Sequence, residues 1–137
     1  LEGYKKALAE WQIPFNQDLV YESEFEIKQT SELGRRLVME EDVTAVFATA
    51  DIMAAGIMAG VHKAGYQVPR DLSIVGFDDI NWCKMMNPML TSVHQDANVK
   101  GEIAADYMMA LLEGKVIDKK QIVLPVSLSV RESVAKI

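Results

Sequence analysis

The sequence lacks several features that would direct a first interpretation. It holds a single cysteine, Cys83, in 137 residues, which excludes an internal disulfide and fits a reducing compartment. It has no apolar run of about 18 residues, so no membrane-spanning helix is predicted, and no signal-peptide pattern is recognised. Basic residues are the minority, since 14 Lys and Arg stand against 20 Asp and Glu, for a net charge of −6. We therefore do not expect this chain to bind a phosphate backbone by itself.

Side chains suited to catalysis or metal binding are also few. His62 and His94 are far apart in the pattern and show no acid–base partner, and Cys83 has no base beside it. We expect Cys83 to be an inert packing residue and His62 to lie on a helix surface. The methionines are expected in the core or at an interface, because a Cu(I) site needs converging ligands. They include Met53, Met58, Met85, Met86 and Met89. No catalytic residue, metal site or cofactor is predicted.

What the sequence does hold is enough apolar surface for one packed domain, since 50% of its residues are hydrophobic. The chain opens with LEGYKKALAEW, which is already helical in pattern, and without an initiator methionine. We interpret it as a piece of a longer protein, beginning near the start of a helix.

The stretch Val68–Ile80, VPRDLSIVGFDDI, is typical of a turn, a buried strand and then an acidic pair. Pro69 ends the preceding helix, and the run Leu72–Phe77 is mostly apolar. Asp78 and Asp79 follow at once. Ligands of open α/β sheets bind beyond the carboxyl ends of the strands, so this pair is a candidate binding site.

An earlier strand and helix complete a βαβ unit with this stretch. Val43–Ala48 is rich in β-branched and aromatic residues, and the helix Ile52–Ala64 follows it, with Thr49 or Asp51 as a candidate cap. The two strands should be parallel, so the turn after the first lies at the same sheet edge as the acidic pair. The sequence thus predicts an α/β fold with a mostly parallel sheet flanked by helices.

The rest of the chain supplies further elements of both kinds. Helical spacing predicts helices at Leu1–Gln12, Ile27–Glu41 and Asn98–Glu113, and a short one at Asn81–Met86. Strand patterns occur at Leu19–Tyr21, Leu90–His94, Ile122–Leu124 and Leu128–Val130. If the first of these strands is parallel to the others, Glu24 and Phe25 reach the same sheet edge.

A different function for two acids at a strand end is the coordination of Mg²⁺ for phosphoryl chemistry. That function needs a further acidic nucleophile or a lysine at a strand end. The sequence places neither nearby.

Four linked segments carry a more specific signal: TAVFATADIMAAGIMAGVHKAGYQVPRDLSIVGFDDI, then NPMLTSVHQ, then GEIAADYMMALLEGK, then LPVSLSVRESVA. Together with weaker matches at GYKKAL and YESEF, they resemble the effector-binding domain of the LacI/GalR family of bacterial transcription regulators. The resemblance runs over nearly the whole chain and keeps the order and spacing of the family.

The resemblance implies a two-lobed fold, like that of type I periplasmic sugar-binding proteins, with a small molecule held between the lobes. It assigns residues 1–94 to the C-terminal lobe, 95–118 to a crossover helix of the N-terminal lobe, and 119–137 to the returning strands. The helix-turn-helix with which family members bind operator DNA as dimers lies outside this chain, as does most of the N-terminal lobe.

Roles for individual residues follow from the resemblance. Asp78 is expected to accept hydrogen bonds from effector hydroxyls or amines, the alternative being a cap on the short helix after it. For Asp79 the capping or structural role is favoured. Phe25 is expected either to stack on the effector or to fill a gap in the core. Gln95 is expected to contact the ligand or to bond the hinge backbone, and the hinge is favoured.

Two alanines depart from the pattern of the family. Ala50 stands in the effector-pocket turn where many relatives carry asparagine or serine, and Ala97 stands where some sugar-responsive relatives carry an aromatic residue. These departures remove side chains from the usual sugar pocket, and the effector stays unnamed. Asp51, next to the first of them, is expected to cap its helix and not to touch a ligand.

Homodimerisation is expected around the helix Met53–Ala64 and the segment Cys83–Met89, which in the family lie at the dimer interface. The predicted interface residues are Met53, Ile57, Val61, Trp82, Met85 and Met86. Because the opposing lobe is missing, the apolar face of Asn98–Glu113 is expected to dock onto a second copy or onto the remaining lobe.

The function that the resemblance implies is effector sensing by a cytoplasmic transcription regulator, without catalysis or a membrane partner, the effector being a sugar or sugar derivative. One alternative with the same architecture is a transport-associated periplasmic sugar-binding protein. Another is a protein partner as the effector, since some catabolite-control members bind a phosphorylated carrier protein.

Overall fold

The computed structural model describes residues 1–117 and 121–136. In chain order the elements are α1 (Glu2–Glu10), the 3₁₀ turn η1 (Gln17–Leu19), α2 (Ile27–Met39), β1 (Ala45–Phe47), α3 (Asp51–Lys63), β2 (Ser73–Asp78), the 3₁₀ turn η2 (Asn81–Lys84), β3 (Thr91–Gln95), α4 (Ala97–Leu112) and β4 (Val126–Ser129). The predicted α/β class is confirmed.

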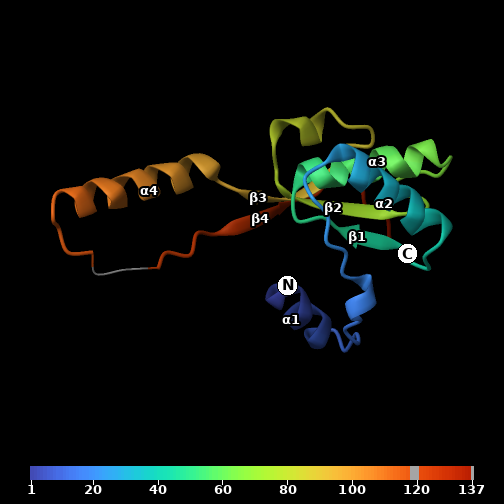
Figure 1. Cartoon of the computed structure of the whole chain (residues 1–137), viewed down its shortest axis with the longest axis horizontal. Coiled ribbons are helices and arrows are strands. Elements are labelled where there is room, and N and C mark those ends of the chain that lie inside the picture. The colour runs from blue at the N-terminus through green and yellow to red at the C-terminus, as the bar shows by residue number, and fades with distance from the viewer. Residues whose placement is uncertain (118–120, 137) are drawn as a thin grey trace.

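The described strands form one sheet in the order β1-β2-β3-β4 (Figure 1). β1 is parallel to β2 with Val46 beside Ile74, and β2 is parallel to β3 with Phe77 beside Val93. β4 runs antiparallel to β3. The predicted βαβ unit is therefore present, and the carboxyl ends of β1, β2 and β3 meet at one edge of the sheet.

Helices α2 and α3 lie together on one side of the sheet (Figure 1). Their backbones approach closely because glycines face the partner helix: a Cβ on Gly60 would lie 1.8 Å from the carbonyl oxygen of Ser31, and one on Gly34 would lie 2.1 Å from that of Ile57. Beneath them, Leu72 just before β2 and Ile74 within β2 are fully buried. The core is thus a layer of helices packed on the sheet, as expected for this class.

Helix α4 differs from the other helices in its surroundings. It projects away from the rest of the chain, between the outgoing β3 and the returning β4 (Figure 1), and none of its residues is buried. Its neighbour is the returning segment, where Ile122 and Leu124 share a shallow groove with Ile103 and Tyr107. Of the two partners expected for α4, the remaining lobe is ruled out, because the two strands that carry the helix lead away from the helix layer. Docking onto a second copy stays a prediction.

Two predicted strands do not form. Near Leu19–Tyr21 the chain instead makes η1, because the side chain of Asn16 accepts a hydrogen bond from the backbone N–H of Asp18 and turns the chain. Ile122–Leu124 has no strand structure, and the strand predicted at Leu128–Val130 begins earlier, as β4. Glu24 and Phe25 therefore do not follow a strand end.

The last part of the chain returns to the sheet at the edge opposite to the acidic pair. Ser133 is fully buried there, where its Oγ donates to the carbonyl oxygen of Ile74 at 2.6 Å and accepts from the N–H of Thr91 at 2.8 Å. Residues 131–135 thus tie the starts of β2 and β3 together. Within the described residues, no helix combines the length and the apolar character that a membrane span requires.

Candidate functional site

Asp78 is the last residue of β2, and it lies beside His94 of β3 at the carboxyl edge of the sheet. Its side chain is partly exposed, and its Oδ1 accepts a hydrogen bond from Nε2 of Gln95. Lys100 of α4 donates in turn to Oε1 of Gln95 at 3.4 Å. The structure therefore brings together two of the predicted site residues, Asp78 and Gln95, at the predicted edge. Gln95 bonds to a side chain and not to the hinge backbone that was favoured for it.

The backbone at the acidic pair has an unusual conformation, with φ of 105° at Asp78 and 55° at Asp79. Residues other than glycine rarely adopt a positive φ, so contacts with the surrounding structure must stabilise this backbone conformation. The N–H of Asp79 donates to Oγ of Ser92 at 3.1 Å, and the N–H of Ile80 donates to Oδ2 of Asp51 at 2.9 Å. Two neighbouring elements thus fix the turn that presents Asp78.

Asp51 does not cap α3, contrary to the prediction. The cap position is Ala50, which has no side-chain acceptor, and Asp51 follows it as the first helical residue. Its carboxylate is 1% exposed, accepts from Oγ of Ser92 at 2.6 Å, and holds the turn after β2 as described above. The buried carboxylate is satisfied by partners distant in sequence, so Asp51 fastens α3 to the candidate site.

Asp79 has a structural role, as favoured from the sequence. Its Oδ1 accepts from the guanidinium of Arg131 at 2.6 Å, and its Oδ2 accepts from Oγ of Ser129 at 2.8 Å and lies 3.2 Å from Nδ1 of His94. Burial acts to raise the pKa of Asp79, but Ser129 and Arg131 together outweigh it and hold that pKa below its ordinary value. Asp79 thus joins the ends of β2, β3 and β4.

The contact with Asp79 corrects the view that His94 has no acidic partner. The Mg²⁺ hypothesis is weakened as well. Asp78 bonds to Gln95, whereas Asp79 is paired with Arg131, which neutralises its charge. In the described part of the chain, no three His, Cys, Asp or Glu side chains gather as a metal site would require.

Phe25 and Ala50 are placed differently from each other. The ring of Phe25 is 71% exposed just before α2, so it does not fill a gap in the core. Ala50 is buried, with 6% exposure, in the turn between β1 and α3 at the same sheet edge as Asp78. Effector contact by either residue stays a prediction.

The predicted dimer interface needs correction at two positions. Ile57 and Val61 are 2% and 0% exposed in the core between α2 and the sheet, because α3 buries its apolar side within the chain. They are not available to a second copy. Met53 and Met86 are partly buried against the same core. Trp82 and Met85, in and just after η2, are 60% and 80% exposed and remain available.

Cys83 packs inside η2 with no exposed surface. Burial, with a smaller contribution from the nearby carboxylate of Asp51, raises the pKa of its thiol to about 12. The predicted packing position of Cys83 is confirmed, as is the surface position of His62, and the raised pKa agrees with the expected low reactivity of the thiol.

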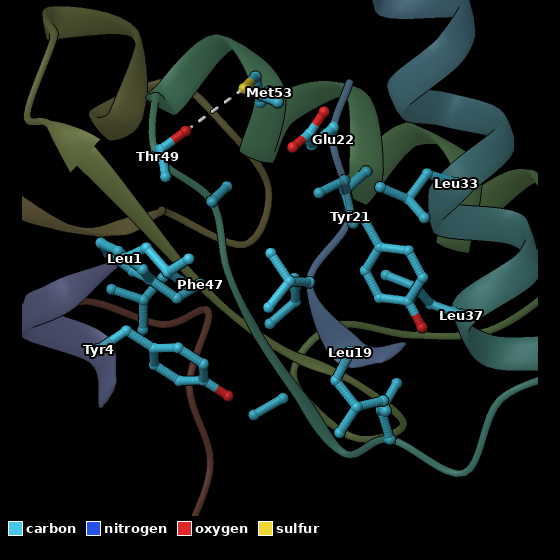
Figure 2. A pocket seen from close by; sticks show the side chains of 17 residues that line it. Leu1, Tyr4, Leu19, Tyr21, Glu22, Leu33, Leu37, Phe47, Thr49 and Met53 are labelled. Atoms are coloured by element: carbon cyan, nitrogen blue, oxygen red, sulfur yellow. Dashed lines mark hydrogen bonds between the residues drawn. The ribbon is translucent and has the colours of Figure 1, made fainter. Parts of the chain in front are cut away.

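A separate cavity of about 590 Å³ lies along β1, which is an edge strand of the described sheet (Figure 2). Residues 19–22 form its opposite wall, Leu33 and Leu37 of α2 close one side, and Leu1 and Tyr4 approach from α1. Its lining is mainly apolar and includes neither Asp78 nor Gln95. This cavity is therefore distinct from the polar site at the ends of the strands.

Sequence reasoning missed Arg131, Ser92 and Ser129, which complete the support of the acidic pair. A signal was present, because polar residues that alternate with apolar ones in a strand predicted to be packed need partners when buried. Ser92, Ser129 and Arg131 lie 13, 50 and 52 positions along the chain from Asp79, the residue that each of them contacts, so no local pattern reveals the contacts.

Comparisons with known proteins agree with this architecture. The family model of the periplasmic binding protein-like domain matches residues 1–134. The transcriptional repressor PurR of Vibrio parahaemolyticus is 30% identical over 138 residues, which cover 100% of this chain and 41% of the repressor. The chain thus spans about two fifths of the length of such curated relatives.

Solved structures are similar over the same span. The transcription regulator CcpA of Lactococcus lactis matches with a TM-score of 0.90 and 28% identity, over 97% of this chain and 49% of that one. A LacI family regulator from Enterococcus faecium, with bound ribose, matches with a TM-score of 0.86 and 30% identity, over 99% of this chain and 51% of that one. The chain therefore belongs to the periplasmic binding protein-like domain family, and over nearly its whole length it is similar to one part of LacI family transcription regulators.

Proposed function

We propose that this chain forms one wall of the effector-binding cleft of a LacI/GalR-type transcription regulator, and that the effector is a sugar or sugar derivative. The observation that carries the proposal is the position of Asp78, which offers a partly exposed carboxylate at the carboxyl edge of the sheet. Open α/β sheets bind ligands at this edge. The bound ribose in the similar Enterococcus faecium regulator supports the choice of effector class.

The chemistry of the edge suits a ligand with several hydroxyl groups. A carboxylate is an acceptor with about four lone-pair sites, so it can bind neighbouring hydroxyls while Gln95 occupies one of its oxygens. Stacking of the sugar ring on Phe25, whose ring is exposed, is a further part of the proposal that comes from the family resemblance. Ala50 adds no hydrogen-bonding side chain, so in this proposal Asp78 and Gln95 provide the polar recognition on this wall.

The proposal assigns residues 1–94 to one lobe, 95–118 to a crossover helix of the other lobe, and 119–137 to the return. The environment of α4 supports this division, since Met108, Met109 and Leu112 are more than half exposed on a helix that projects from the sheet. Such a face is expected to be covered by a second lobe. Ligand binding between the lobes then favours the arrangement that binds the ligand better.

The remaining parts of the proposal concern the whole regulator. A helix-turn-helix segment binds operator DNA, the effector changes its affinity for DNA, and the domain acts in the cytoplasm without catalysing a reaction. Homodimerisation uses the exposed apolar side chains of Ile80, Trp82 and Met85, which are 37%, 60% and 80% exposed.

A titration followed by NMR tests effector binding, because this 15.3 kDa chain is small enough for amide spectra and millimolar affinities are measurable. D-ribose, hexoses, sugar phosphates and purines are added to the ¹⁵N-labelled chain. We expect a sugar to shift the amides of residues 78–80 and 49–51, and Asp78→Ala to abolish the response. Silence toward every compound of the panel, both in this chain and in the chimera with a complete cleft described next, contradicts the proposal.

A chimera provides a second test with a complete cleft. Residues 1–137 replace the matching half of the Enterococcus faecium regulator, and ribose binding is measured by calorimetry. Binding that persists and is lost in Asp78→Ala supports the role of this wall, whereas binding unaffected by Asp78→Ala contradicts it.

Sedimentation tests the dimer. Trp82→Arg combined with Met85→Glu should convert a wild-type dimer to a monomer, while Lys28→Glu on the exposed surface of α2 serves as the control. A wild-type chain that sediments as a monomer at high concentration argues against this interface in the chain as it stands.

A further inference from the structure

A continuous series of polar contacts runs from β2 to α4 at the candidate site. Gln95 donates from Nε2 to the carboxylate of Asp78, and its Oε1 accepts from Nζ of Lys100 at 3.4 Å. The amide nitrogen thus faces an anion and the amide oxygen faces a cation, which is the one orientation of the amide that satisfies both neighbours. Both the nitrogen and the oxygen of the Gln95 side-chain amide therefore have a hydrogen-bonding partner.

Gln95 lies at the junction between β3 and α4, so its contacts connect the candidate site to the start of that helix. Gln95 ends β3, and the next residue, Asp96, caps α4 by accepting from the N–H groups of Asn98 and Val99 at 3.1 and 3.0 Å. Lys100 stands in the first turn of that helix. A displacement of the Asp78 carboxylate therefore reaches the first turn of α4 through two hydrogen bonds.

The support of the two acids is unequal. Asp79 has its carboxylate held by Arg131, Ser129 and His94, whereas Gln95 is the hydrogen-bonding partner that the described residues give to Asp78. The carboxylate of Asp78 is thus free to respond to a ligand, and Gln95 is the side chain that senses the response. Asp79, which three side chains hold, is the more firmly fixed of the two acids.

We propose that Gln95 is a positioning residue that aims the Asp78 carboxylate at the effector and passes a change at that carboxylate to the first turn of α4 through Lys100. The inference rests on the proposed function, since it concerns the effector site. It adds the residue that couples this site to the crossover between the lobes.

The first experiment needs no ligand. The side-chain amide resonances of Gln95, identified by their loss in Gln95→Ala, are compared in the wild-type chain and in Asp78→Ala. Removal of the carboxylate should shift both amide protons and speed their exchange with water, because a charge-assisted hydrogen bond is lost. Unchanged resonances and exchange overturn the proposal, since they show that the contact does not form in solution.

The second experiment measures affinity with D-ribose as the probe. Gln95→Ala should weaken binding about tenfold, as expected for the loss of a hydrogen bond to a charged group, and lower the melting temperature only slightly because the contact is partly exposed to solvent. Gln67→Ala is the matched control, a glutamine exposed after α3 and remote from β3. Equal or tighter binding by Gln95→Ala overturns the proposal.

The third measurement separates coupling from simple support. Ribose should shift the amides of Asn98, Val99 and Lys100 in the wild-type chain. In Lys100→Met these shifts should disappear while the affinity stays within about twofold, because the contact of Gln95 with Asp78 remains. Shifts in α4 that survive in Lys100→Met overturn the route through Lys100.

The outcomes also separate this inference from the function on which it rests. Failure of both the wild-type chain and the chimera with a complete cleft to bind ribose or any other compound of the panel overturns the proposed function, and the inference with it. A wild-type chain that binds ribose while Gln95→Ala binds it equally well overturns the inference alone.

Discussion

Helices α3 and α4 have similar sequences and opposite surroundings. Both are rich in Ala and Met, and both follow a strand of the same sheet. Yet α3 buries residues along most of its length between α2 and the sheet, whereas α4 buries none. Apolar composition therefore indicates that a helix requires a partner surface, but it does not say whether that surface belongs to the same part of the chain.

The largest effect that tests this comparison is expected from one truncation made in each helix. Ile57→Ala in α3 removes a side chain that is 2% exposed and should lower the free energy of unfolding by about 3 to 4 kcal/mol. Leu112→Ala in α4 alters a side chain that is 74% exposed and should change it by less than about 0.5 kcal/mol. Urea denaturation followed by tryptophan fluorescence measures both. Equal losses would show that α4 is packed in solution.

Arg131 follows β4 and binds Asp79 at the end of β2. Its replacement should lower the free energy of unfolding nearly as much as Ile57→Ala. Arg131→Met leaves the carboxylate of Asp79, 10% exposed, without its counter-charge, so we expect a loss of about 3 kcal/mol at neutral pH. Arg131→Lys keeps the charge without the forked geometry and should lose less.

The pH dependence of the loss gives a second check of the Arg131 prediction. The pKa of Asp79 is below its ordinary value in the folded chain, so its contacts stabilise the fold above the unfolded pKa. That contribution is lost as the pH falls through the folded pKa. The difference between Arg131→Met and the wild type should therefore shrink in acid, and a difference that is constant with pH would contradict the assignment.

Close packing of α3 on α2 can be tested by a single methyl group. In Gly60→Ala, the new Cβ would lie 1.8 Å from the carbonyl oxygen of Ser31, a backbone atom that cannot move without shifting its helix. We expect a loss of about 2 kcal/mol, since the cost of overpacking exceeds the gain in helix propensity. Differential scanning calorimetry measures the loss, and a neutral result would mean that the two helices are further apart.

The smallest effect on stability is expected from a glycine-to-alanine substitution in α4. A Cβ on Gly101 has no atom within 4 Å, so Gly101→Ala should stabilise α4 by about 0.5 to 1 kcal/mol through helix propensity alone. Amide hydrogen exchange of residues 101–112 reports this local change. A destabilised helix would indicate that another surface, such as a second copy, covers Gly101.

The same contrast explains what the sequence allowed us to predict. The βαβ unit from β1 to β2 was predicted correctly, because its strands, glycines and turn residues give strong local signals. The strand at Leu19–Tyr21 was wrong, because a short apolar run forms a strand only when a neighbouring strand pairs with it. Ile57 and Val61 were assigned to an interface for a similar reason, since apolar residues fill every side of α3.

The acidic pair shows the same limit at the level of the site. Its place at the sheet edge could be inferred from the end of a strand, and the structural role of Asp79 from the family resemblance. Contact of Asp78 with an effector stays a proposal. The role of Asp51 could not, because its partners Ser92 and Ile80 lie 41 and 29 residues away. Hydrogen bonds of this kind depend on the arrangement of the whole sheet, which local propensity does not encode.

The single buried thiol provides a built-in reporter for the body of the molecule. Cys83 is unreactive while η2 is packed, since a thiol with a pKa of about 12 is almost wholly protonated at neutral pH and has no exposed surface. A thiol-specific reagent will therefore modify the chain only when this segment opens, and the rate of labelling measures how often it does. Because Cys83 lies beside Asp51, a ligand that stabilises the turn after β2 should slow that rate, so effector candidates can be screened through the natural thiol, without an engineered tag.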